Sequence, residues 1–192
     1  MGITTNNFFE NIYSVIFSPK AFFERQDLQI SIRLAIATIA FISAVNIILT
    51  AIASGAITSW LFIFTFIFKV ITALICWFLT GLFFEYIAKI FDRGGQLNKL
   101  LFLTAFAPIP YIFYAPLNLL KNSGDIGYVF CTLIEVTVYF WVIWLYALCL
   151  KNTYNLTNSR AFMMILIPFI SSFFAIYWGV CFFQKLWYIF SV

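Results

Sequence analysis

The sequence predicts an all-α polytopic membrane protein, a bundle of five transmembrane helices preceded by an interfacial N-terminal helix. Hydrophobic residues make up 64% of the chain and charged residues only 9%, whereas a soluble domain carries about 25% charged residues. The apolar residues gather into five long runs, and about 20 helical residues suffice to cross a bilayer. Because backbone polar groups in lipid must be satisfied within the segment, these runs are expected to be helices.

The five runs define the expected organisation of the chain. An N-terminal interfacial segment occupies residues 1–32, and a single five-helix domain occupies residues 33–192. The second and fifth runs exceed a perpendicular span, so tilt or an interfacial extension is expected there. The runs are Leu34–Ser54 and stretches within Trp60–Phe91, Leu97–Leu120, Ile126–Leu150 and Ala161–Phe190.

The N-terminal segment carries apolar and aromatic residues at helical spacing. This periodicity predicts a short helix that lies in the membrane interface, either as an anchor on the cytoplasmic leaflet or as a helix that docks a partner. The expected anchor residues are Phe9, Ile12, Tyr13, Ile16 and Phe22.

The positions of the basic residues predict the orientation. Of the eleven basic residues, eight lie in the N-terminal segment and in the second and fourth connections, which are expected on one side of the membrane. Two lie in the third connection and at the C-terminal end, on the other side, and Lys69 lies within a span. By the positive-inside rule, the N-terminus is expected in the cytoplasm and the C-terminus outside. These scattered residues form no basic stripe, so no nucleic-acid partner is expected. The eight residues are Lys20, Arg25, Arg33, Lys89, Arg93, Lys99, Lys151 and Arg160.

Residue usage argues against catalysis and cofactors. The chain has no histidine, which excludes Ser-His nucleophile pairs and His-based metal sites. Its cysteines lie in apolar spans without metal-ligand spacing, and no phosphate-binding glycine motif is present. We therefore expect a non-enzymatic protein without metal or cofactor. The cysteines are Cys76, Cys131, Cys149 and Cys181.

Three polar residues within spans are expected at related depths. Lys69 lies about 30 Å along its helix from Lys89, and Glu135 about 24 Å from Lys151. Both helices are expected to run inward, so Asn46, Lys69 and Glu135 would form a polar cluster in the outer half of the bundle. The alternatives are a structural Lys69–Glu135 pair, a lysine that snorkels to the outer surface, and an ion or proton path.

The third run contains Pro108, Pro110 and Pro116 within nine residues. Proline removes a helical hydrogen bond and disfavours helix at the preceding residue. A break near the middle of the membrane is therefore expected, either as a packed kink or as the broken helix of a transporter site.

The connection before the third run is expected to be a tight cytoplasmic turn. Gly94 and Gly95 supply the conformational freedom for the reversal. Glu85 precedes Lys89 by four residues, the favourable order for a helical ion pair at the cytoplasmic interface.

The order of these features resembles the Yip family of five-span membrane proteins. The resemblance covers roughly residues 8–190 and implies a cytoplasmic N-terminus and, for eukaryotic members, roles in vesicle trafficking, membrane shaping and engagement of small GTPases. The short N-terminal region is similar to that of prokaryotic members, for which the resemblance implies no assigned activity, and a prokaryotic cell membrane is the expected location. The resemblance is carried by Ser18–Arg25, Gly94-Gly95, Lys99-Leu100-Leu101, Trp141, Trp144 and Arg160-Ala161.

Three function classes follow, of which the third, after the two below, is a membrane enzyme that acts on lipid. The leading expectation is a membrane scaffold or adaptor whose partners are the lipid bilayer, other membrane proteins or a second copy of the chain. A small GTPase enters only through the family resemblance. The alternative is a small transporter or channel that uses the broken third helix and the polar cluster.

Overall fold

The computed structural model describes residues 8–25, 30–54, 61–121 and 125–168, together with positions 170, 174, 177, 178 and 182. Every regular element in this part of the chain is a helix. Three helices are long and apolar enough to cross a membrane, namely Ile32–Ile52, Leu61–Ile90 and Ile126–Tyr154. The predicted class, a helical membrane bundle, is confirmed.

The helices follow the predicted runs closely. Residues 158–168 begin a further helical segment at the start of the fifth run, and most of that run lies outside the described residues. The elements in order are α1 (Phe8–Phe17), α2 (Pro19–Glu24), α3 (Ile32–Ser54), α4 (Leu61–Ile90), α5 (Leu97–Thr104), the 3-10 helix η2 (Ile109–Phe113), α6 (Tyr114–Leu120) and α7 (Asp125–Tyr154).

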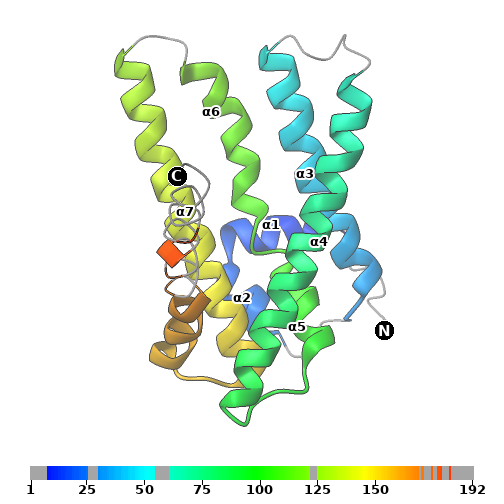
Figure 1. Ribbon diagram of the computed structural model, residues 1–192, viewed down its shortest axis with the longest axis vertical. Helices are drawn as coiled ribbons and strands as arrows, with labels where there is room; N and C mark the ends of the chain where they lie inside the picture. The colour runs from blue at the N-terminus through cyan, green and yellow to red at the C-terminus, as the bar shows by residue number, and fades with distance from the viewer. Residues whose placement is uncertain are drawn as a thin grey trace, which may run out of the picture.

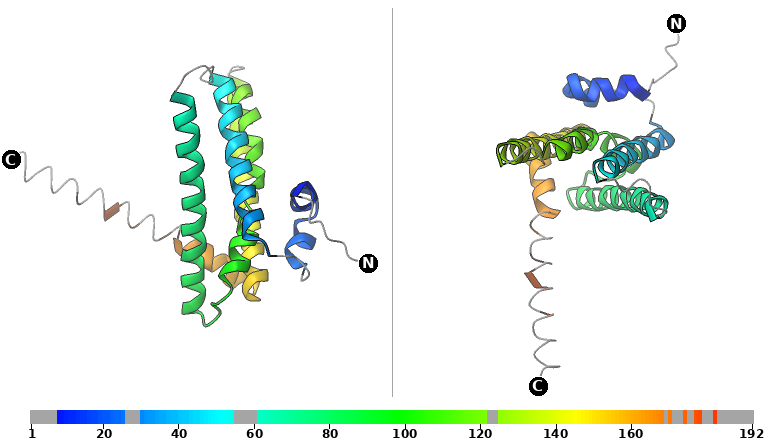
Figure 2. Two further views of the ribbon diagram at one scale, coloured as in Figure 1. Left: turned by 90° about the vertical axis from the view of Figure 1, so that its right-hand side faces the viewer. Right: turned by 90° about the horizontal axis from the view of Figure 1, so that it is seen from above.

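The three long helices and α6 stand side by side in the order α7, α6, α3, α4 (Figure 1). α3 packs against α4 on one side and α6 on the other, and α6 packs against α7. The short helices α1 and α2 lie on one face of this row, with α1 crosswise to the long helices (Figure 2). The end where α4 and α7 finish and α3 and α5 begin carries all eight basic residues named above, and we call it the basic end.

The third run is broken into three pieces. α5 ends at Thr104, a turn covers residues 105–108, and η2 and α6 continue toward the opposite end. Pro108 and Pro110 lie in or beside the turn, and Pro116 lies in the first turn of α6, where a missing amide hydrogen costs little. The turn is closed locally, since the amides of Phe106 and Ile109 donate to Leu103 and Phe106.

The hydrophobic core is concentrated at the basic end. In α4, none of the residues before Trp77 is buried, whereas six residues from Trp77 to Ala88 are buried. α5 enters this core, where its last five residues are at most 4% exposed. At Gly81 a Cβ atom would collide with the Leu101 side chain, so the glycine permits the close approach of α4 and α5.

The N-terminal helices contribute to the same core. Val15 of α1 and Phe22 and Phe23 of α2 are buried in it, and the Phe22 ring contacts that of Phe106. Phe22 was expected at the membrane interface, but it is 0% exposed because α2 packs against α7 and the turn after α5. Ile12 and Ile16 likewise pack against the core.

The outward face of α1 presents three aromatic side chains instead. Phe9, Tyr13 and Phe17 are 72%, 63% and 67% exposed, and their spacing of four residues places them on one helix face. We call these three residues the aromatic row. Two of the expected anchor residues, Phe9 and Tyr13, belong to it.

Replacing Phe22 with Ala is expected to destabilise the protein by about 3–5 kcal/mol, because a buried aromatic side chain leaves a cavity. The matched change Phe9→Ala removes the same atoms from an exposed position and should leave the unfolding midpoint in detergent nearly unchanged. Thermal unfolding of both variants measures the difference. Equal losses would contradict the assignment of Phe22 to the core and Phe9 to the surface.

Candidate functional site

The three polar residues expected to cluster do not come together. Lys69 is exposed on α4, whereas Glu135 lies on α7, and α3 and α6 stand between these helices away from the basic end (Figure 1). The Asn46 side chain donates to the Ile42 carbonyl one turn earlier on α3 (3.0 Å). Lys69 and Glu135 can lie at similar depths without touching, because counting residues along a helix predicts the depth of a side chain but not which helices are neighbours.

Glu135 instead forms an ion pair with Lys121, at the end of the bundle opposite the basic end. The lysine Nζ lies 2.7 Å from Oε1 and 2.8 Å from Oε2, and the two side chains are 26% and 20% exposed. The hydrogen bond to the Glu135 carboxylate raises the pKa of Lys121 above its ordinary value. Lys121 is therefore charged at neutral pH, and its contribution to stability declines as the pH rises through its raised pKa.

The α6–α7 contact surrounding this pair is aromatic. The Tyr114 hydroxyl donates to the Glu135 carbonyl oxygen (3.3 Å), and the ring of Tyr114 packs edge-on to that of Tyr139. Tyr111 contacts both rings. The ion pair and the three rings hold the hairpin of α6 and α7 together, which is a structural role.

At the basic end, Glu85 joins three segments that are distant in sequence. Its side chain is buried on α4 and accepts hydrogen bonds from the Tyr154 hydroxyl at the end of α7 (2.5 Å) and from the Gly95 amide. We expected an ion pair with Lys89, but Lys89 is exposed and the carboxylate points inward. A buried carboxylate must be hydrogen-bonded, and the Tyr154 hydroxyl and the Gly95 amide provide these hydrogen bonds in place of the expected Lys89.

The backbone at Gly94 and Gly95 passes close to the Glu85 carboxylate. Gly95 has a φ of 99°, in the region that favours glycine, and Asp92 has a φ of 56°. A side chain at Gly94 would collide with Lys89 and would lie 3.3 Å from the Glu85 carboxylate oxygen. Both glycines thus lie in the turn where they were expected, and they let the backbone wrap the Glu85 side chain.

Two further polar contacts fix α5 between its neighbours. The Trp77 indole nitrogen of α4 donates to the Thr104 hydroxyl (3.2 Å), and the Lys99 ammonium donates to the Asn152 carbonyl oxygen of α7 (3.1 Å). Together with the Glu85–Tyr154 hydrogen bond, they tie α4, α5 and α7 into one unit. We call these three contacts the polar clamp.

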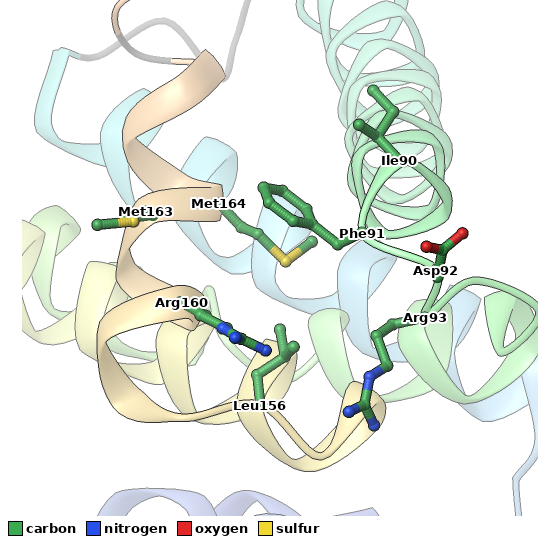
Figure 3. Close-up of a pocket in the computed structure, with 8 residues that line it drawn as sticks. All are labelled: Ile90, Phe91, Asp92, Arg93, Leu156, Arg160, Met163 and Met164. Carbon is green, nitrogen blue, oxygen red and sulfur yellow. The ribbon is translucent and has the colours of Figure 1, made fainter.

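A pocket of about 370 Å³ lies beside the clamp, between the end of α4 and residues 158–168 (Figure 3). Two arginines, one from each side, border an apolar wall that includes Phe91 and Met164. The Asp92 carboxylate points away from both guanidinium groups (Figure 3). The lining residues are Ile90, Phe91, Asp92, Arg93, Leu156, Arg160, Met163 and Met164.

A second pocket of about 350 Å³ lies between α2, α7 and residues 158–168, with Lys20, Glu24 and Lys151 among its lining residues. Within the described residues, no group of three metal-ligating side chains occurs. Cys76, Cys131 and Cys149 are free thiols, and Cys181 lies outside the described residues. The charged residues that line the two pockets are Asp92, Arg93 and Arg160 in the first and Lys20, Glu24 and Lys151 in the second.

Neutralising one partner of the Lys121–Glu135 pair is expected to remove the coupling between them. A double-mutant cycle of Lys121→Met and Glu135→Gln should give a favourable coupling energy of the small size that is typical of a partly exposed ion pair. The same cycle with Lys69→Met serves as control and should be additive. Coupling of Glu135 to Lys69 rather than Lys121, measured by unfolding in detergent, would contradict this arrangement.

Removing the Tyr154 hydroxyl should destabilise the basic end, because it takes a donor from a buried carboxylate. We expect Tyr154→Phe to lower the free energy of unfolding by about 1.5–3 kcal/mol. Tyr86→Phe, at an exposed position on the same helix as Glu85, should have little effect. If both variants unfold at the wild-type midpoint, the Tyr154–Glu85 hydrogen bond does not stabilise the protein.

Comparison with known proteins assigns this architecture to a family. The family model of the Yip1 domain matches residues 13–179, which extend from the second half of α1 well into the fifth run. No curated protein and no solved structure matches the chain. The chain is an integral membrane protein, and it belongs to the Yip1 domain family.

Proposed function

We propose that this protein is a non-enzymatic membrane scaffold or adaptor of the Yip type, with its basic end in the cytoplasm. The orientation is supported by the gathering of the eight basic residues at that end, which the positive-inside rule assigns to the cytoplasmic face. Both pockets then lie on the side of the membrane where soluble and lipid-anchored partners are found.

The main support for the proposal is that α1 packs one face against the bundle and exposes aromatic side chains on the other. Its inward face packs against the bundle, where Val15 is fully buried in the core and Asn11 is 2% exposed. Its outward face presents the aromatic row, in which the rings of Tyr13 and Phe17 lie 4.5 Å apart. A preorganised helix that exposes aromatic side chains loses little conformational entropy on binding.

The occupant that we favour is another membrane protein. Aromatic side chains are enriched among residues that dominate protein interfaces, and three of them on one helix face form a compact anchor set. α1 lies crosswise beside the long helices (Figure 2), so its outward face is directed sideways from the bundle, toward a neighbour in the same membrane. A small GTPase is the partner class that the family suggests by analogy.

The adaptor proposal predicts a defined protein neighbour at the aromatic row. A photo-crosslinking amino acid at position 13, irradiated in native membranes, should give one discrete protein adduct. Ala substitutions at Phe9 and Phe17 should reduce that adduct severalfold, because the flanking rings contribute to the same contact surface.

The matched control places the crosslinker at Tyr128, which is similarly exposed at the other end of the bundle. This position should give lipid adducts. Lipid adducts alone at both positions would contradict the adaptor role and leave α1 as a membrane anchor. Ion or solute flux in proteoliposomes, abolished by Glu135→Gln, would instead support the transporter alternative.

A further inference from the structure

We propose that the 370 Å³ pocket between α4 and residues 158–168 is a binding site for a membrane phospholipid with an anionic, phosphate-bearing headgroup. In this proposal, Arg93 and Arg160 hold the phosphate and the apolar wall receives the upper part of an acyl chain. The site is independent of the aromatic row and does not rest on the adaptor role.

The first argument is charge. The Arg160 guanidinium points into the pocket and the Arg93 side chain flanks it beyond Leu156 (Figure 3). Within the described residues, neither guanidinium group has a carboxylate at salt-bridge distance. Guanidinium groups bind phosphate oxygens in a bidentate manner, so two of them at one pocket favour a phosphate over a carboxylate or a halide ion.

The second argument is the apolar wall. Phe91 and Met164 line the pocket on one side of Arg160, Leu156 lies between the two arginines, and Ile90 belongs to the end of α4 (Figure 3). Methionine side chains are flexible and adapt to irregular apolar ligands. Free inorganic phosphate would make no apolar contact with this wall. An amphiphile would contact the arginines with its charged part and the wall with its apolar part.

The third argument is position. α4 has 30 residues and is therefore about 45 Å long, which matches a bilayer of about 40–45 Å including its headgroups. The pocket at the end of α4 thus lies at headgroup level. Exposed apolar side chains occur on both elements that border the pocket, with Phe83 on α4 and Ile167 on residues 158–168. They offer a path for the remainder of the chain.

The fourth argument is the leaflet: in the proposed orientation, the pocket at the basic end lies in the cytoplasmic leaflet. Anionic lipids give the cytoplasmic leaflet a negative surface potential, and basic pockets between helices on that side are suited to anionic headgroups. The neighbouring pocket differs, because Glu24 lies there with Lys20 and Lys151. For that reason we assign the lipid to the pocket of Arg93 and Arg160.

The test measures retention of lipid by the full-length protein. Detergent-solubilised protein is mixed with phosphatidylglycerol or phosphatidylcholine of identical acyl chains, and bound lipid is counted by native mass spectrometry. We expect preferential retention of phosphatidylglycerol, weakened about tenfold for each arginine removed in R93Q, R160Q and the double variant. R93K/R160K should be intermediate, because lysine keeps the charge but loses the bidentate contact.

The matched control is R25Q/R33Q, which removes two exposed charges from the same end without touching the pocket. It should retain phosphatidylglycerol as the unmodified protein does. Equal loss in this control would show unspecific surface attraction and overturn the proposal, as would equal retention of phosphatidylcholine.

Soluble competitors distinguish the source of the phosphate. Inorganic phosphate and glycerol 3-phosphate should fail to displace phosphatidylglycerol at concentrations comparable to that of the lipid, because they lack the acyl chain. Displacement by either at such concentrations would identify a site for a soluble anion and overturn the lipid assignment. The adaptor role would survive this result, since it is tested at position 13.

Discussion

The packing of α5 between α3, α4 and α7 is the constraint on which the rest of the structure depends. α5 has only eight residues, too few to be a stable helix in isolation. It is kept in place by the core around Leu100 and Leu103 and by the polar clamp. Because the clamp joins residues as far apart as Glu85 and Tyr154, it fixes the ends of α4 and α7 relative to each other.

This arrangement divides the molecule into two unequal parts. At the basic end, helices pack around a dense core that also receives α1 and α2. Toward the opposite end, the first half of α4 buries no residue. This is expected for a helix that faces lipid, because moving an apolar side chain from lipid to a helix interface brings no hydrophobic gain in free energy. There the Lys121–Glu135 pair and the tyrosine rings supply the specific contacts that hydrophobic packing does not.

The two proposals use the same rigid base in different ways. The aromatic row lies on the outward face of α1, and the arginine pocket lies across the bundle between α4 and residues 158–168. A core that immobilises both surfaces lets each present its side chains in a fixed geometry. The break after α5 belongs to this core, since Phe106 and Ile109 are fully buried and the turn satisfies its own amides.

The sequence by itself determined the class of protein, the bounds of the long helices, the break at the prolines and the turn at Gly94 and Gly95. These features depend on local properties, namely apolar length, the missing proline amide and the freedom of glycine. Only the tertiary structure decided that Glu135 pairs with Lys121 and not Lys69, that Glu85 turns inward to Tyr154, and that Phe22 is buried. Depth along a helix follows from counting residues, but the neighbours of a helix and the face it turns toward them depend on how all the helices pack together.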